Sequence, residues 1–448
     1  MEPTFRVKDG MYLIGSLERG LTVYKQQVRA HNLVWSLWEL HRRSELKIDQ
    51  VAIVGGGIAG LTAAACFLSR FDNVSITLFE QNLDLCPLQQ GADHRWLHPR
   101  IYDWPTYGSR APSASLPVLN WSEGRASDVA RTILNEFSEF RLASTRSEER
   151  LVMYLGLKTF RINAADNKIE WVANKTKPAG AFLPIEGKKG DTKVFDTIIL
   201  APGFGLETKV PGFRTESYWR NEQLGQPRLD AKVHKFLISG YGDGALIDLC
   251  RLTIERYRQD TILNELFPND LERTEHDLAR ERETRTDRDT FHFFESIEEV
   301  LAPAQSQLST RLRKDTTVFL HISGEQGKVK SISEIFGPTS SFQNRMMAFL
   351  LLRSGGFTPC YGRLKTAVKR FGIRETNVLC RYGTNRIKHL RSIFVDADHI
   401  HPRLMELKKI QGQRPALFWE PGTFPQYPVK GQARNGKSIL KPGAGASS

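Results

Sequence analysis

The sequence predicts an α/β protein, because apolar strands, glycine-rich turns and helices alternate along much of the chain. The clearest unit is residues 51–80, VAIVGGGIAGLTAAACFLSRFDNVSITLFE, where a strand, a glycine turn, a helix and a second strand follow one another. Two further segments, 194–205 and 234–252, also end an apolar strand in glycine. Together these observations predict a sheet of the dinucleotide-binding, Rossmann-like type.

The first glycine turn has the spacing G-x-G-x-x-G, which gives a tight turn and lets the backbone approach a pyrophosphate. The phosphates would lie at the N-terminus of the helix that follows. Glu80 ends the second strand, where a carboxylate accepts hydrogen bonds from ribose hydroxyls and repels a 2'-phosphate, so we expect NADP to be disfavoured. The predicted cofactor-binding residues are Gly55, Gly57, Ile58, Ala59, Gly60 and Glu80. The alternative is a Rossmann unit that keeps its glycines for packing alone.

The segment VFDTIILAPGFG, residues 194–205, resembles an element of FAD-dependent oxidoreductases with a glutathione-reductase-like FAD domain. In that FAD/NAD(P)-binding Rossmann superfamily, a strand returns to the first sheet and ends in an Ala-Thr-Gly-like turn. Here Pro202 stands where threonine is usual, before Gly203. The resemblance implies bound FAD, with Gly203 near the cofactor. An ordinary buried strand with a glycine stop is the alternative.

The third glycine cluster admits two interpretations. Gly240, Gly242 and Ala245 fit G-x-G-x-x-A, the form of the NAD(P) site in flavoproteins that hold two dinucleotides. The resembled superfamily also has a late Gly-Asp pair that closes its FAD site, and Gly242 and Asp243 match it. An NAD(P) unit needs a strand soon after its helix, whereas residues 253–300 are charged and helical in character. We therefore favour a modified or FAD-facing turn at Gly240, Gly242 and Asp243, with NAD(P)H left open as a second cofactor.

The length of 448 residues predicts more than one domain. The fold class expected is a Rossmann-like FAD/NAD(P)-binding domain with inserted and C-terminal α/β or helical segments. The predicted parts are an N-terminal helical extension at 1–49, a Rossmann core from 50–80 plus 194–250, an inserted substrate or cap region at 81–193, a charged helical insertion at 251–315, a second α/β region at 316–429 and a disordered tail at 430–448. The N-terminal helix packs on the Rossmann lobe or, as the alternative, docks a protein partner.

The segment CPLQQGADHRWLHPRIYDWP, residues 86–105, concentrates polar and aromatic side chains. Histidines exchange protons near pH 7, arginines hold carboxylates or phosphates, and aromatic rings stack on a flavin. The weak catalytic candidates are His94, Arg95, His98, Arg100 and Tyr102. No acid or base is assigned among them. The alternative is a structural loop pinned by aromatic packing and Arg–Asp pairs.

Composition excludes several classes of protein. The net charge of +13 permits attraction to anions, but the basic residues are dispersed and no nucleic-acid motif accompanies them, which argues against nucleic acid. No run approaches the roughly twenty apolar residues of a membrane span. Five scattered cysteines without a C-x-x-C pair fit a reducing cytoplasm and argue against a disulfide-active reductase. Metal-ligand spacing is absent, so no metal is expected.

The sequence predicts a cytoplasmic protein with a dinucleotide site, and the resemblance to flavoproteins implies an FAD-dependent oxidoreductase that acts on a small-molecule substrate, with NAD(P)H left open as its reductant. The flavin would carry the redox chemistry and the protein would supply positioning and electrostatics. Three alternatives stay open: an NADPH-dependent flavin monooxygenase, an amine or amino-acid oxidase, and a non-catalytic dinucleotide-binding sensor or interaction protein.

Overall fold

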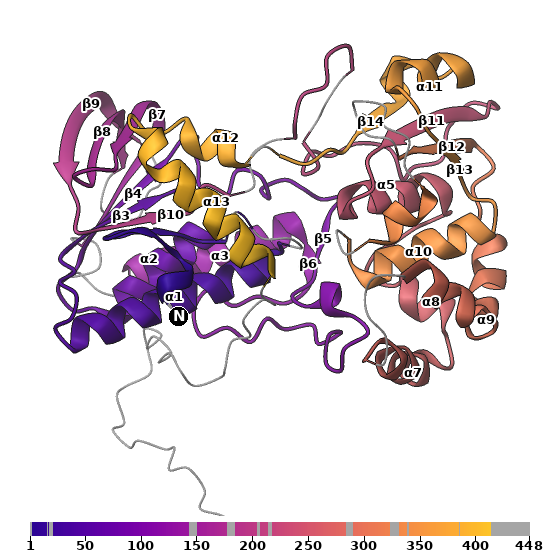
Figure 1. The fold of residues 1–448 in the computed structure, drawn as a ribbon, viewed down its shortest axis with the longest axis horizontal. Coiled ribbons are helices and arrows are strands. Elements are labelled where there is room, and N and C mark those ends of the chain that lie inside the picture. The colour runs from indigo at the N-terminus through magenta and orange to yellow at the C-terminus, as the bar shows by residue number, and fades with distance from the viewer. Residues whose placement is uncertain are drawn as a thin grey trace, which may run out of the picture.

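The computed structural model describes residues 2–15, 17, 21–142, 150–176, 184–203, 207–213, 217–283, 290–322, 331–337, 340–384 and 386–413. These residues form two lobes, each built on its own sheet (Figure 1). The first lobe holds an eight-stranded mixed sheet and the second a four-stranded parallel sheet. The predicted tail at 430–448 lies outside the described residues.

The first sheet has the order β1-β2-β10-β3-β4-β7-β8-β9. Its strands are β1 (Arg6–Lys8), β2 (Met11–Leu13), β3 (Gln50–Val54), β4 (Ser75–Glu80), β7 (Leu151–Asn163), β8 (Lys168–Thr176), β9 (Pro184–Val194) and β10 (Thr197–Leu200). The adjacent strands β2, β10, β3, β4 and β7 run parallel to one another. Beyond them, β8 pairs antiparallel with β7, and β9 pairs antiparallel with β8. When β8 and β9 are left out and the remaining strands are numbered along the chain from β3, the strands β7, β4, β3 and β10 lie in the order 3-2-1-4, which is the order of one Rossmann half.

Helices cover both faces of the first sheet. The helices α1 (Val23–Arg42), α2 (Ile58–Arg70) and α3 (Ala126–Leu142) share a core with Val51 and Ile53, while Ala52 and Val54 face the other side. That side is covered by α12 (Arg386–Arg391) and α13 (Ala397–Gln413). This alternation is the two-residue period of a strand buried on both faces.

Two expectations about domain limits differ from the structure. The last described helices, α12 and α13, return to the first lobe instead of belonging to a separate C-terminal region (Figure 1). The N-terminal extension is not helical alone, because β1 and β2 precede α1 and join the first sheet. Strands of three residues are too short to show a periodic pattern in the sequence.

The second sheet has the order β13-β12-β11-β14 and is parallel throughout. Its strands are β11 (His234–Ser239), β12 (Thr316–His321), β13 (Thr358–Cys360) and β14 (Val378–Cys380). Its helices are α5 (Asp243–Thr253), α6 (Ile262–Leu266), α7 (Leu271–Glu283), α8 (Thr290–Ser296), α9 (Glu298–Ser309), α10 (Phe342–Arg353) and α11 (Leu364–Phe371). Counted along the chain, these strands also lie in the order 3-2-1-4.

The position of β11 corrects the prediction that residues 234–250 belong to the first sheet. β11 pairs with β12 and β14 in the second sheet. The four helices α6 to α9 lie in the chain between α5 and β12. They separate two strands that a Rossmann unit normally places close together in sequence, so the local pattern hides the pairing.

A segment of the first lobe's insertion enters the second lobe; we call residues 91–110 the strap. Within it, β5 (Trp96–Leu97) pairs with β6 (Gly124–Arg125), and a 3-10 helix follows at Ile101–Asp103. Ile101 and Trp104 are buried in the core of the second lobe. Among the described residues, further short 3-10 helices lie at Glu2–Thr4, Ile332–Phe336 and Glu375–Asn377.

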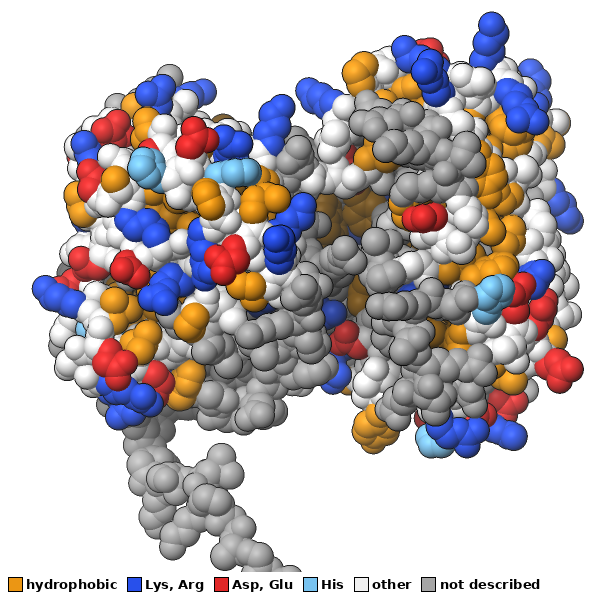
Figure 2. Space-filling model, in the orientation of Figure 1, with side chains coloured by type: hydrophobic (Ala, Val, Ile, Leu, Met, Phe, Trp, Pro, Cys, Tyr) orange, Lys and Arg blue, Asp and Glu red, His pale blue; other side chains and the backbone are white. Residues whose placement is uncertain are grey.

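The visible face of the molecule mixes basic and acidic side chains over both lobes (Figure 2). Exposed basic residues therefore do not gather into one continuous stripe on this face. In the part of the chain that the structure describes, no helix is both long and apolar enough to traverse a bilayer.

Candidate dinucleotide-binding sites

The first glycine turn connects β3 to α2, and two of its glycines are required by close packing. Gly55 has φ +115°, and a Cβ placed there would collide with the carbonyl oxygen of Ala201. A Cβ at Gly60 would collide with the carbonyl oxygen of Gly55. Both positions therefore need glycine for the fold itself, whether or not a ligand binds.

Gly57 is different, because the fold does not require a glycine there. It caps α2 with φ −77° and ψ 177°, an extended conformation that any residue adopts. A Cβ at Gly57 would meet nothing within 4 Å. The space above Gly57 is open and borders the first residues of α2, Ile58 and Ala59, whose N–H groups have no partner within the helix. A pyrophosphate would find donors and a positive helix end at this place.

Glu80 lies at the tip of β4 and is tied to the glycine turn. Its side chain is buried, and Oε2 accepts a hydrogen bond from the Gly56 N–H at 2.7 Å. Oε1 accepts from the backbone N–H and the side-chain amide of Asn82 at 2.8 and 2.7 Å. A carboxylate oxygen can accept two hydrogen bonds, so Oε2 keeps acceptor capacity for a ribose hydroxyl. The arrangement fits the predicted role of Glu80.

The strand β10 returns beside β3, as the resemblance implies. Leu200 pairs with Val54 in parallel register, and the turn Ala201, Pro202, Gly203 then lies against the glycine turn. Gly203 has φ +68°, and a Cβ there would meet nothing within 4 Å. The next residues, 204–206, lie outside the described ones.

The second glycine turn connects β11 to α5 and repeats the geometry of the first. Gly240 has φ +123°, and a Cβ there would collide with the carbonyl oxygen of Arg381. Gly242 caps α5 with φ −78° and ψ 177°, within one degree of Gly57. A Cβ at Gly242 would also meet nothing within 4 Å. The second turn therefore has the same open space at the start of its helix.

The turn after β14 likewise repeats the turn after β10. The Arg381 N–H donates to the last carbonyl of β11 at 2.8 Å, and the Ala201 N–H donates to the last carbonyl of β3 at 2.8 Å. Gly383 has φ +71° where Gly203 has φ +68°. The chain thus contains two geometrically matched dinucleotide-type units. The sequence left this second unit open as the less favoured interpretation of residues 234–252, because its strands lie far apart along the chain.

Asp243 has a structural partner of its own. Its Oδ1 accepts hydrogen bonds from the Ser341 N–H and the Asn344 side-chain amide, both at 2.7 Å. These groups lie at the start of α10, so the carboxylate caps that helix. Burial raises the pKa of Asp243. The predicted contact of Asp243 with a cofactor stays a prediction, and the structure gives its carboxylate a different use.

Arg95, a weak catalytic candidate, is buried at the contact between the strap and the second lobe. Its Nη1 lies 2.9 Å from Asp248 Oδ1 in α5, its Nε donates to the Tyr218 carbonyl at 2.6 Å, and its guanidinium lies 3.8 Å from the centre of the Tyr218 ring. Burial opposes the ionisation of Asp248, but the charges of Arg95, Arg381 and Arg251 outweigh it and hold the pKa at about 2. Such a pair fixes the strap to α5.

The other candidates in the strap also have structural partners. The Nδ1–H of His94 donates to the Glu222 carbonyl at 2.6 Å. His98 Nδ1 accepts from two backbone N–H groups, including that of Arg100 at 3.1 Å. Tyr102 packs against the core of the second lobe, where burial raises its pKa. This geometry is that of the alternative, a loop pinned by aromatic packing and an Arg–Asp pair. The catalytic roles stay predictions.

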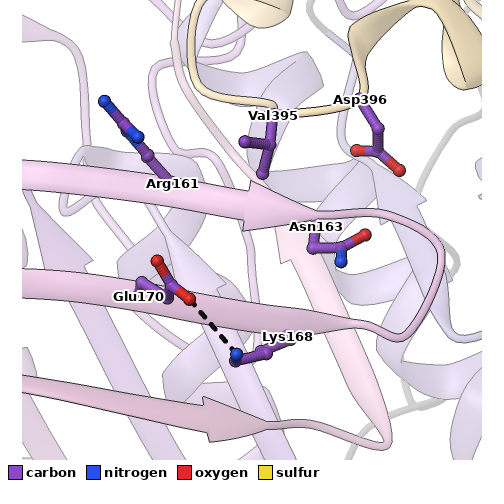
Figure 3. A pocket seen from close by; sticks show the side chains of 6 residues that line it. All are labelled: Arg161, Asn163, Lys168, Glu170, Val395 and Asp396. Atoms are coloured by element: carbon purple, nitrogen blue, oxygen red, sulfur yellow. Dashed lines mark ion pairs between the residues drawn. The ribbon is translucent and has the colours of Figure 1, made fainter.

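Two surface pockets lie away from the glycine turns. One, with a volume of about 250 Å³, lies between the β7–β8 hairpin and the segment before α13 (Figure 3). Its lining residues are Arg161, Asn163, Lys168, Glu170, Val395 and Asp396. Lys168 pairs with Glu170 at 3.2 Å, and the Asp396 carboxylate accepts from two backbone N–H groups. A second pocket is lined by Lys209, Val210, Pro211 and Phe213. Neither pocket includes a residue of the glycine turns, and a dinucleotide site is defined by its backbone turn more than by an enclosed cavity.

Among the described residues, no group of three or more His, Cys, Asp or Glu side chains could hold a metal ion. The five cysteines are free and buried. Burial raises the pKa of Cys360 to about 12, so this thiol stays protonated at neutral pH.

A comparison with known families identifies the first unit. A family model described as an NAD(P)-binding Rossmann-like domain matches residues 53–101. Residues 53–101 are similar to an NAD(P)-binding Rossmann-like domain, and the fold of this unit is Rossmann-like. The matched residues of this Rossmann-like domain run from β3 through the glycine turn, α2 and Glu80 into the strap. No curated protein matches the chain.

Solved structures show distant similarity. A thioredoxin reductase from Lactococcus lactis is 11% identical with a TM-score of 0.29, over 70% of this chain and 64% of that chain. An NAD-dependent persulfide reductase from A. fulgidus is 10% identical with a TM-score of 0.29, over 75% and 45%. OTEMO, in complex with FAD and NADP, is 13% identical with a TM-score of 0.27, over 46% and 37%. The chain spans less than two thirds of each of these proteins. Similarity this distant carries no functional argument, so function must be argued from the geometry of this chain.

Proposed function

We propose that the protein is an FAD-dependent oxidoreductase that binds FAD at the first glycine turn and a nicotinamide dinucleotide at the second, and acts on a small-molecule substrate. The observation that carries the proposal is the repetition of one turn geometry at Gly55–Gly57 and Gly240–Gly242. Each turn ends at an open helix N-terminus, which suits a pyrophosphate.

The residues of the first turn fit the AMP half of a dinucleotide. The N–H groups of Ile58 and Ala59 begin α2 above the open space at Gly57, and Glu80 offers an acceptor for an unphosphorylated ribose. This ribose is present in FAD and NAD but not in NADP. The returning strand β10, with its Ala-Pro-Gly turn, supports FAD through the resemblance to flavoproteins. FAD, when bound, supplies an acceptor for a hydride equivalent.

The second turn fits a nicotinamide dinucleotide. The strand order, the open space at Gly242 and the small residue Ala245 at the packing position are those of a complete unit. The Asp243 carboxylate accepts hydrogen bonds from the Ser341 N–H and the Asn344 amide at the start of α10. The residue of the second unit that matches Glu80, one position after the pair of Ser239 with His321, is the apolar Ile322, which does not repel a 2'-phosphate as a carboxylate would, so NADH and NADPH both fit.

The second unit also bears on the alternatives. An NADPH-dependent flavin monooxygenase would use both turns and is the second candidate. An amine or amino-acid oxidase has no use for a nicotinamide site, and the matched second turn therefore disfavours it. A non-catalytic sensor would bind the dinucleotides without turnover, and the following measurement separates it from an enzyme.

The test is a visible absorption spectrum of the purified protein, repeated after anaerobic addition of NADPH and of NADH. We expect the bands of oxidised flavin, and we expect one of the nicotinamides to bleach them. Flavin bands that persist would contradict the nicotinamide site, and a protein that stays colourless after reconstitution with FAD would contradict the flavin site. Oxygen consumption with NADPH then distinguishes a monooxygenase from a reductase.

A further inference from the structure

The two matched units differ at the ends of their first two strands. In the first unit, Val54 pairs in register with Phe79, so the position is apolar. In the second unit, Ser239 pairs in register with His321, and both side chains are fully buried. The first unit shows that the fold is satisfied by an apolar pair. Burying a hydroxyl and an imidazole costs free energy unless both are hydrogen-bonded, so the polar pair needs a reason other than the fold.

The hydrogen bonds of this pair run in one direction. His321 Nε2 lies 2.8 Å from the Gly362 carbonyl, which can only accept, so Nε2 carries the hydrogen. Burial lowers the pKa of His321, which keeps the ring neutral near pH 7 and leaves Nδ1 as an acceptor. Ser239 Oγ lies 2.7 Å from Nδ1 and donates to it. Ser239 Oγ in turn accepts from the hydroxyl of Tyr382.

Tyr382 lies where a ligand of the second unit would bind. It follows β14 and occupies the position that Pro202 holds after β10, between the Arg381 carbonyl that packs on Gly240 and the left-handed Gly383. Tyr382 is half-buried. The strand order reverses between β11 and β14, and open α/β sheets bind ligands at the carboxyl ends of their strands at such a point.

We propose that Ser239 and His321 position the Tyr382 phenol to accept a hydrogen bond from the nicotinamide dinucleotide at the second turn; this inference rests on the proposed function. The phenol directs its own proton to Ser239, so its oxygen meets a ligand as an acceptor. The matching donors on the ligand are the carboxamide N–H of nicotinamide and the hydroxyls of its ribose. Tyr382 is then a specificity-determining residue, and Ser239 and His321 are positioning residues.

The test is a fluorescence titration of the flavin-loaded protein with NADPH and NADH. Tyr382→Phe removes only the hydroxyl, and we expect a Kd about 3- to 10-fold weaker, the usual value of one hydrogen bond. Ser239→Ala should weaken binding similarly. Because Ser239 acts through the phenol, the double variant should bind no more weakly than Tyr382→Phe alone, whereas independent structural effects would add. Tyr361→Phe, at an exposed tyrosine after β13, is the matched control and should leave Kd unchanged.

An analogue separates the two donors. The 3-acetylpyridine dinucleotide lacks the carboxamide N–H and keeps the ribose. If the carboxamide donates to Tyr382, the wild-type protein prefers NADPH over the reduced analogue, and Tyr382→Phe reduces that preference about 3- to 10-fold. If a ribose hydroxyl donates, the variant weakens both ligands equally.

Unchanged Kd values in Tyr382→Phe, with binding by the wild-type protein intact, would overturn this inference alone. A wild-type protein that binds no nicotinamide would overturn the proposed second site and this inference with it. Thermal unfolding of each variant, within a few degrees of wild type, confirms that the fold is retained.

Discussion

Two glycines of one motif should respond to substitution in opposite ways. Gly57 adopts an extended conformation with open space at its Cβ, so Gly57→Val should fold as the wild-type protein does. A β-branched residue suits this conformation, and exchanging residues at an N-cap costs about 1 kcal/mol or less. The new side chain would occupy the space where the pyrophosphate should lie. Gly60→Ala should fail differently, because its Cβ would collide with the Gly55 backbone, which cannot move without breaking the turn.

The magnitudes separate the two outcomes. A ligand at 100 times its Kd stabilises the folded state by about 2.7 kcal/mol. Gly57→Val should therefore keep the free energy of unfolding of the apoprotein within about 1 kcal/mol of wild type and lose the stabilisation that FAD adds. Gly60→Ala should destabilise the apoprotein by about 3 kcal/mol or more, the upper range for overpacking. Gly242→Val is the matched control, because it should keep flavin binding and lose nicotinamide binding.

The assay is urea unfolding with and without added FAD or NADPH, together with the flavin content of each purified variant. Two results would refute the reasoning. One is a Gly57→Val protein that keeps its flavin and its FAD-dependent stabilisation, since the open space would then not be the pyrophosphate site. The other is a Gly60→Ala protein as stable as wild type, since the close approach in the turn would then not constrain the fold.

Two further predictions concern stability. His31 is fully buried, and burial lowers its pKa from 6.5 to about 4. Between these two pH values the unfolded chain therefore binds more protons than the folded protein. The free energy of unfolding should fall by roughly 3 kcal/mol as the pH drops from 6.5 to 4. Urea unfolding of His31→Gln across this range should show a shallower slope, and an unchanged slope would assign the acid sensitivity to other groups. Arg95→Ala removes a buried partner of Asp248 and should cost about 3 kcal/mol or more. The control Arg131→Ala, from an exposed pair with Asp128, should cost less than about 1 kcal/mol. Equal losses of stability in both variants would argue that the buried pair of Arg95 and Asp248 does not hold the strap on α5.

The sequence predicts the first unit well because all its determinants are local. The strand, the turn, the helix and Glu80 lie within thirty residues, and the structure joins Glu80 directly to the turn at Gly56. The pairing of β10 with β3 is non-local, and only the resemblance to flavoproteins pointed to it. Local pattern therefore predicts the unit, and a known topology extends it.

The second unit was underestimated for a physical reason. A parallel strand is paired with a partner that the chain reaches only after a crossover, and here four helices lengthen that crossover between α5 and β12. The residues of an apolar strand do not indicate which other strand it will pair with. The contacts of the strap are equally hidden from sequence analysis, because Arg95 binds Tyr218 and Asp248, which lie more than a hundred positions later in the chain. A sequence segment rich in polar and aromatic residues has the same composition whether it lines an active site or forms a buried contact between two lobes.

The strap is synthesised well before the part of the second lobe against which it packs. Trp104 is fully buried against Phe342, with a 5.8 Å separation of ring centres, and its indole N–H donates to Glu275. The ribosome makes Trp104 long before Phe342, and at 5–20 residues per second the interval is roughly ten to fifty seconds. During that time the insertion of the first lobe carries an indole whose partner in α10 does not yet exist, and the face of the first sheet that α12 and α13 cover is also still open. The strap can therefore complete its contacts with the second lobe only after α10 has emerged.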